Sequence, residues 1–138
     1  MPEPITTVLG FDFGRHWTGV AVGQTLTRQA RALAAIKTGD WNRIGHLIDE
    51  WRPQRLIVGL PLNMRGESQE MSARAERFSR QLEGRYGIRT ELIDERLTTR
   101  EAYTVAIESG QKKSRKEIDS LSAVLITESW LREQEADS

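Results

Sequence analysis

The chain has 138 residues, a length that favours a single domain spanning residues 1–138 with a core that needs no crosslinks. It contains no cysteine, no secretory signal pattern and no apolar run of about 18 residues, so disulfides, thiolate metal sites and membrane spans are excluded and a soluble cytoplasmic protein is expected. Twenty Lys and Arg balance twenty Asp and Glu, and this neutral total does not by itself indicate a nucleic-acid-binding protein.

The first part of the chain predicts three strands and a helix. Residues 8–13, 19–23 and 30–37 carry strand patterns, with a glycine turn between the first two. Asp40 is a good helix N-cap, and Pro53 is suited to follow the end of the helix. Between them, apolar residues recur at helical spacing: Trp41, Ile44, Leu47, Ile48 and Trp51.

The middle of the chain alternates strands and helices. The short apolar run 56–58 suits a central strand that is covered on both faces, and residues 90–94 suit a further strand. A helix is predicted between them from about Ser68, and Gly84 or Gly87 is expected to end it. Its apolar stripe consists of Met71, Ala75, Phe78 and Leu82.

Two further helices are predicted towards the C-terminus. Residues 98–101 have the form of a capping box, and the last helix carries an apolar stripe of Ile118, Leu121, Val124, Leu125 and Leu131. Three successive strands with short connections favour antiparallel pairing, whereas the later alternation favours parallel strands joined by crossover helices. We therefore expect an α/β fold, in which a mixed five-stranded sheet is flanked by helices.

Carboxylates at the ends of predicted strands are candidates for chemistry. Asp12 lies in the first apolar strand, where a buried carboxylate is costly unless it is paired or binds a metal, although it can also cap the following turn. Asp94 and Glu95 end a later strand, and since successive strand side chains point to opposite faces, only one of them can face the side of Asp12. Spacing does not say which. The structural alternative is a polar strand end with Arg96 as a salt-bridge partner.

Asp119 is a third candidate, in the predicted first turn of the C-terminal helix, where an acidic residue also complements the helix dipole. If the fold brings three carboxylates together, they repel one another and suit Mg²⁺ or Mn²⁺ rather than Zn²⁺. Two such ions about 4 Å apart can activate a water and stabilise the leaving oxygen of a phosphodiester. The histidines, His16 and His46, have no ligand-like spacing.

A basic cluster directly precedes Asp119 in the sequence. Such a cluster is usually a solvated loop, but here it can also contact phosphates beside a metal site. Its members are Lys112, Lys113, Arg115 and Lys116.

Four segments in order resemble the YqgF or RuvX family, a RuvC-like branch of the ribonuclease H superfamily. They are GFDFGRHWTGVAVGQ at 10–24, IVGLPLNMRGE at 57–67, DERLTTREA at 94–102 and KKSRKEIDSLSAVLI at 112–126. The resemblance covers nearly the whole chain. It implies a ribonuclease H-like nuclease domain with Mg²⁺ or Mn²⁺ as cofactor.

The resemblance also implies roles for individual residues. It identifies Asp12, Glu95 and Asp119 as the catalytic and metal-binding carboxylates, and it selects Glu95 over Asp94. Further candidates for contacts with nucleic acid, beside the basic cluster, are Arg15, Asn63, Arg65 and Arg96. The turn Arg15-His16-Trp17 departs from the family, whose members commonly carry Lys or a small polar residue there.

The resemblance leaves the substrate open. Members of the family are described as nucleases that process the 5′ end of pre-16S ribosomal RNA and as Holliday junction resolvases, so the expected partner is pre-rRNA or branched DNA, with ribosomal particles as a further partner. The chain can act as a monomer or a homodimer, and cutting a two-fold junction would need two active sites.

Two other classes of protein remain as alternatives. A non-catalytic nucleic-acid-binding assembly factor would be favoured if one of the three carboxylates were missing, but all three are present. The segment DFGRHWTGVAVG at 12–23 also resembles the phosphate loop of actin-like ATPases and sugar kinases. Those proteins need two such lobes around a nucleotide cleft, whereas this chain is one lobe long.

Overall fold

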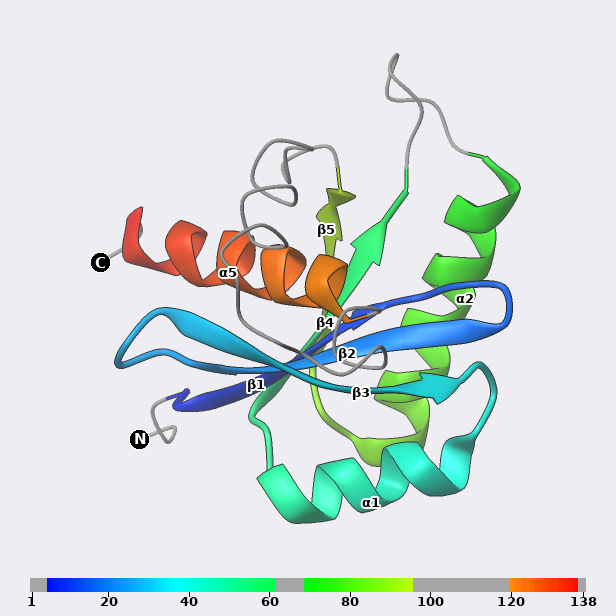
Figure 1. The fold of residues 1–138 in the computed structure, drawn as a ribbon, viewed down its shortest axis with the longest axis horizontal. Coiled ribbons are helices and arrows are strands. Elements are labelled where there is room, and N and C mark those ends of the chain that lie inside the picture. Colours follow the sequence, from blue (N-terminus) through cyan, green and yellow to red (C-terminus); the bar gives the residue numbers. More distant parts are fainter. Residues whose placement is uncertain (1–4, 62–68, 96–119, 137–138) are drawn as a thin grey trace.

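The computed structural model describes residues 5–61, 69–95 and 120–136. Five strands form one sheet in the order β3-β2-β1-β4-β5 (Figure 1). The strands are β1 (Thr7–Asp12), β2 (Trp17–Gln24), β3 (Gln29–Lys37), β4 (Arg55–Leu60) and β5 (Thr90–Asp94). The helices in the described part of the chain are α1 (Trp41–Trp51), α2 (Glu70–Tyr86) and α5 (Leu121–Ala136).

The pairing of the strands confirms the expected mixed sheet. β1 pairs antiparallel with β2, and β2 pairs antiparallel with β3. β4 then joins the other side of β1 in parallel, and β5 joins β4 in parallel. The helix predicted to begin at residues 98–101 lies outside the described residues. Within the described ranges, no helix is both long and apolar enough to cross a membrane.

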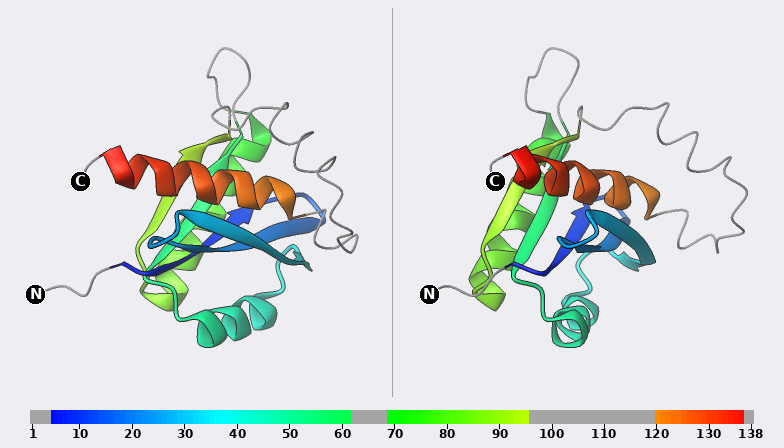
Figure 2. Two further views of the ribbon diagram at one scale, coloured as in Figure 1. Left: turned by 60° about the vertical axis from the view of Figure 1, so that its left-hand side comes forward. Right: turned by 90° about the vertical axis from the view of Figure 1, so that its left-hand side faces the viewer.

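The helices cover the two faces of the sheet separately. α1 and α2 lie on one face and α5 crosses the other (Figures 1 and 2). Successive side chains of β1 point alternately to the two faces of the sheet, so the strand contributes to both layers of helices. Leu9 and Phe11 join the core under α1 and α2, whereas Val8 joins the second core with Trp130 and Leu131 of α5. Alternate residues of one strand thus have different surroundings.

Helix α5 approaches the sheet closely because small residues meet there. A Cβ added to Gly10 in β1 would collide with the hydroxyl of Thr127. That hydroxyl is buried, and it donates to the carbonyl oxygen of Ala123 at 2.6 Å, which satisfies it within the helix. The sequence places Val124 and Leu125 on the buried stripe, but both are half-buried, because neighbouring positions such as Ile126 and Thr127 face the sheet instead.

The ends of the helices follow local chemistry. The side chain of Asp40 accepts from the backbone N–H of Arg43 at 3.1 Å, which confirms the predicted N-cap of α1. Of the two glycines expected to end α2, Gly84 lies inside the helix and Gly87 is the C-cap, with a left-handed φ of 65°. Neither has any atom within 4 Å of the position that a Cβ would occupy.

These two glycines predict opposite effects of the same substitution. Gly84→Ala should raise the free energy of unfolding by about 1 kcal/mol, because alanine is the better helix former. Gly87→Ala should lower it by about 1 kcal/mol, because a side chain is strained at this φ. Urea unfolding of the two variants measures both effects. Shifts in the same direction would contradict the assignment of Gly87 as the cap.

Candidate active site

The carboxylates of Asp12 and Glu95 come together at the edge of the sheet where β1, β4 and β5 end. Asp12 is the last residue of β1 and Glu95 directly follows β5. Val8 and Ile93 pack in the core beneath α5, so alternation along each strand directs Asp12 and Glu95 to this same face. Their side chains share a hydrogen bond. Asp94, one residue earlier, is directed to the opposite face.

Gly59 makes this contact possible. It lies in β4, the strand between β1 and β5, and it pairs with Ile93. A Cβ added to Gly59 would lie 2.6 Å from Oε1 of Glu95 and 2.5 Å from Cδ1 of Ile126. The missing side chain therefore leaves the space through which Glu95 reaches over β4 towards Asp12. The sequence predicts a strand over residues 56–58 that stops at Gly59, whereas β4 runs on to Leu60. The role of Gly59 as a positioning residue becomes apparent only with the neighbouring strands in place.

Burial and mutual repulsion favour a single proton between the two carboxyl groups. Burial, followed by the hydrogen bond with Asp12 and the charges of Asp12 and Asp94, raises the pKa of Glu95 to about 8. Burial also raises the pKa of Asp12, and the hydrogen bond with Glu95 opposes that rise. At neutral pH the neutral Glu95 therefore donates to the Asp12 carboxylate, because two negative charges at this distance are unfavourable.

A hard divalent cation fits this donor set. Carboxylate oxygens are ligands that Mg²⁺ and Mn²⁺ prefer, and a cation can take the place of the proton that holds the pair together. The described residues contain no group of three or more Asp, Glu, His or Cys side chains around one point. Asp119, the third predicted ligand, lies outside the described residues.

The start of α5 is anchored next to the strand that carries Asp12. Ser120 is fully buried, and its hydroxyl accepts from the backbone N–H of Val20 at 3.0 Å. The pairing of β2 with β3 shifts register between Thr18 and Val20. This irregularity adjoins Gly19, the residue of β2 that pairs with Asp12. The sequence alone does not indicate this anchor, because the two residues are 100 positions apart.

The remaining predicted contacts with nucleic acid are mostly outside the described residues. Arg15 is exposed in the turn between β1 and β2, with its Nη2 3.9 Å from Oε2 of Glu70 at the start of α2. Both side chains are more than half exposed, so this ion pair contributes little stability. The predicted contacts that the structure does not describe are Asn63, Arg65, Arg96, Lys112, Lys113, Arg115 and Lys116.

The raised pKa of Glu95 predicts how stability depends on pH in the absence of metal. The folded protein keeps this proton up to about pH 8, whereas the unfolded chain releases it near the ordinary pKa of 4.5. The unfolded state therefore binds fewer protons in this window, and the free energy of unfolding should fall as the pH rises from about 4.5 to about 8.

Urea unfolding in EDTA measures this dependence. Glu95→Gln, which cannot ionise, should show a weaker decline than the wild type. Glu133→Gln alters an exposed carboxylate of α5 and serves as the matched control, with the decline unchanged. Equal declines in the wild type and Glu95→Gln would show that the pair does not share a proton.

Solved structures of similar fold include resolvases. RuvC of Thermus thermophilus aligns with a TM-score of 0.60 at 13% identity, covering 95% of this chain and 97% of that chain. The fowlpox virus Holliday junction resolvase aligns with a TM-score of 0.56 at 15% identity, covering 93% of this chain and 99% of that chain. At these identities the likeness establishes the fold, which is RuvC-like and thus of the ribonuclease H type.

Sequence relatives are far more similar. The chain is 49% identical over 135 residues to a protein of Azotobacter vinelandii, and the match covers 94% of this chain and 95% of the relative. It is 48% identical over 133 residues to a protein of Escherichia coli O157:H7, and this match covers 92% of this chain and 96% of the relative. Both carry the name "Putative pre-16S rRNA nuclease". The family model described as "RuvX: Holliday junction resolvase" matches residues 6–133. The chain belongs to the RuvX family.

Proposed function

We propose that this protein is a metal-dependent endonuclease that hydrolyses phosphodiester bonds at the edge of the sheet marked by Asp12 and Glu95. The observation that carries the proposal is the buried pair itself. Two carboxylates that share one proton in a partly buried site are poorly suited to a purely structural role, because burial without a cation raises the pKa of both. They are well suited to hold Mg²⁺ or Mn²⁺.

The chain's own residues provide the setting for hydrolysis. Asp12 and Glu95 would hold the ion through their carboxylate oxygens, and Gly59 keeps the space in which Glu95 lies. A bound Mg²⁺ or Mn²⁺ supplies Lewis-acid stabilisation of the phosphate and a water of lowered pKa. Glu95 must lose its proton before it can act as a ligand, so the form that binds metal is the doubly ionised pair.

We include Asp119 as the third carboxylate. The support is its position in the sequence, directly before Ser120, together with the anchor of Ser120 on Val20 beside the strand pair of Asp12. We also propose that the basic cluster of residues 112–116, which precedes Asp119, contacts phosphates of the substrate, since a neutral protein must bind nucleic acid through local charge.

The substrate that we favour is the precursor of 16S ribosomal RNA, cut at its 5′ end during ribosome assembly in the cytoplasm. This proposal rests on the names of the relatives, which are close to half identical over nearly their full length. Accumulation of 16S precursor after depletion of the protein would support it. Normal 16S maturation together with persistent recombination intermediates would instead favour the second candidate, a Holliday junction resolvase, which the family description supports.

Substitution of the paired carboxylates tests the catalytic role. Asp12→Asn and Glu95→Gln should each lower the cleavage rate by about a thousandfold, since a loss of about 4 kcal/mol of transition-state stabilisation is expected when a metal ligand is removed. Asp94→Asn removes a charge of the same kind on the opposite face of the sheet, and it should lower the cleavage rate much less. Thermal melting checks that all three variants fold.

The same assay tests the metal. Cleavage should require added Mg²⁺ or Mn²⁺ and stop in EDTA, because all the proposed ligands are oxygen atoms. A mock preparation from cells that lack the protein controls for contaminating nuclease. Undiminished cleavage by Asp12→Asn, or by the wild type in excess EDTA, would rule out this mechanism.

The basic cluster predicts a change in the salt dependence of binding. Alanine at Lys112, Lys113, Arg115 and Lys116 together should weaken binding to DNA and RNA and flatten the log–log salt dependence by about 0.7 to 0.9 for each phosphate that is no longer bound. Preference among sequences should barely change, since phosphates carry no sequence information. If affinity and slope both equal those of the wild type, the cluster is a solvated loop.

A further inference from the structure

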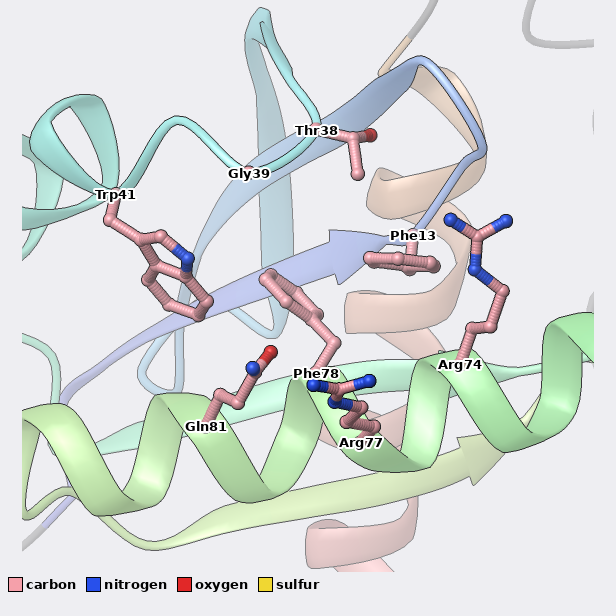
Figure 3. A pocket seen from close by; sticks show the side chains of 8 residues that line it. All are labelled: Phe13, Thr38, Gly39, Trp41, Arg74, Arg77, Phe78 and Gln81. Carbon is pink, nitrogen blue, oxygen red and sulfur yellow. The ribbon is translucent and has the colours of Figure 1, made fainter.

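A pocket lies on the opposite face of the sheet from the Asp12–Glu95 pair. Its volume is about 200 Å³, and it opens between the end of β1, the connection from β3 to α1, and α2 (Figure 3). Phe13, Trp41 and Phe78 form an aromatic wall, and Arg74, Arg77 and Gln81 extend from α2 beside it. We call this the aromatic pocket.

The aromatic wall is continuous and partly open. The ring centroid of Phe78 lies 5.0 Å from that of Phe13 and 5.6 Å from that of Trp41, so the three rings are in contact. Phe78 is 3% exposed and forms the floor, whereas Phe13 and Trp41 are half-buried and leave part of their surface accessible. Large aromatic surface left partly open in a concave site is suited to a planar, apolar ligand group.

Positive charge lies beside this wall. Arg74 and Arg77 are exposed and line the pocket, and among the residues that line it none is acidic. Within the described residues, neither guanidinium forms a salt bridge. The guanidinium of Arg74 lies 5.9 Å from the ring centroid of Phe13, so charge and aromatic surface are adjacent. In a chain with no net charge, such a local excess favours an anionic group.

We propose that the aromatic pocket binds one unpaired nucleotide of a nucleic-acid strand, with the base on the aromatic wall and a phosphate at Arg74 and Arg77. A planar base with an attached phosphate matches both halves of the pocket. The volume of about 200 Å³ limits the ligand, because sites that enclose drug-sized molecules measure roughly 300–1,000 Å³. The pocket is therefore sized for a single base rather than a dinucleotide cofactor.

The position of the pocket favours a strand over a free nucleotide. Phe13 directly follows Asp12, and the two side chains are on opposite faces of the sheet. Both the pocket and the carboxylate pair thus lie at the end of β1, and one strand that passes this edge can contact both. The inference deepens the proposed function, on which it rests, by adding a contact that selects an unpaired region of the substrate.

Binding measured in EDTA tests the pocket without cleavage. The probe is a fluorescently labelled, unstructured oligouridine, followed by anisotropy. Arg74→Gln combined with Arg77→Gln should weaken binding about tenfold and reduce the log–log salt slope by about 0.7 for each phosphate that these arginines no longer bind. Arg80→Gln removes an exposed arginine of the same helix that does not line the pocket, and it should leave affinity and slope unchanged.

Tryptophan fluorescence locates the base. The oligouridine should quench the emission of the wild type, and Trp41→Phe should lose that change while it keeps an aromatic ring for stacking. Phe13→Leu should weaken binding by about tenfold, in the range found for removal of a stacking partner. Thermal melting checks that each variant folds. If Phe13→Leu fails to fold, the arginine variants still test the proposal.

Competition decides the source of the nucleotide. Uridine 5′-monophosphate should compete poorly with the oligouridine, and fully paired duplex RNA should not cause the Trp41 signal. Monophosphate binding as tight as that of the oligouridine would overturn the assignment to a strand. Equal affinity of the double arginine variant and the wild type, or quenching that persists in Trp41→Phe, would overturn the pocket. Because binding is measured in EDTA without cleavage, this test can fail while the cleavage assays succeed, so its failure is distinct from failure of the nuclease proposal.

Discussion

The hydrogen bond between the partly buried carboxyl groups of Asp12 and Glu95 is the interaction on which the site depends. It exists because three parallel strands, β1, β4 and β5, end at the same edge, and because the middle strand carries Gly59 where any side chain would fill the space. Keeping such a pair in the fold is unfavourable when both groups are ionised. The arrangement is therefore better explained by the chemistry that it supports than by stability.

The two faces of the sheet have different surroundings, and β1 contributes side chains to both. On one face, small residues let α5 pack so closely that its Thr127 contacts the backbone of β1 at Gly10. On the other face, α1 and α2 enclose the larger core and leave the aromatic pocket at its end. Because β1 alternates, Asp12 belongs to the first environment and Phe13 to the second. Both proposed contacts with nucleic acid follow from this one strand end.

Much of the fold could be predicted from local patterns. The apolar periods, the Asp40 cap and the order of strands and helices are encoded in short segments, and the mixed sheet follows from them. The choice of Glu95 over Asp94 depends on how β5 sits beside β4, so in the sequence only the family resemblance indicates it. Likewise, Val124 and Leu125 are less buried than their periodicity indicates, because neighbouring positions such as Ala123, Ile126 and Thr127 pack against the sheet.

The parts of the site that could not be predicted are those built from distant segments. Ser120 and Val20 meet across 100 positions, and the aromatic pocket takes residues from the end of β1, the connection from β3 to α1, α1 and α2, whose spacing shows no motif. For the carboxylate pair, the decisive experiment is anomalous X-ray scattering from a crystal soaked with Mn²⁺. We expect an anomalous peak within coordination distance, about 2 Å, of the carboxylates of Asp12 and Glu95, with their mutual hydrogen bond broken. A peak elsewhere, with the pair still hydrogen-bonded, would contradict the assignment of this pair as the metal site.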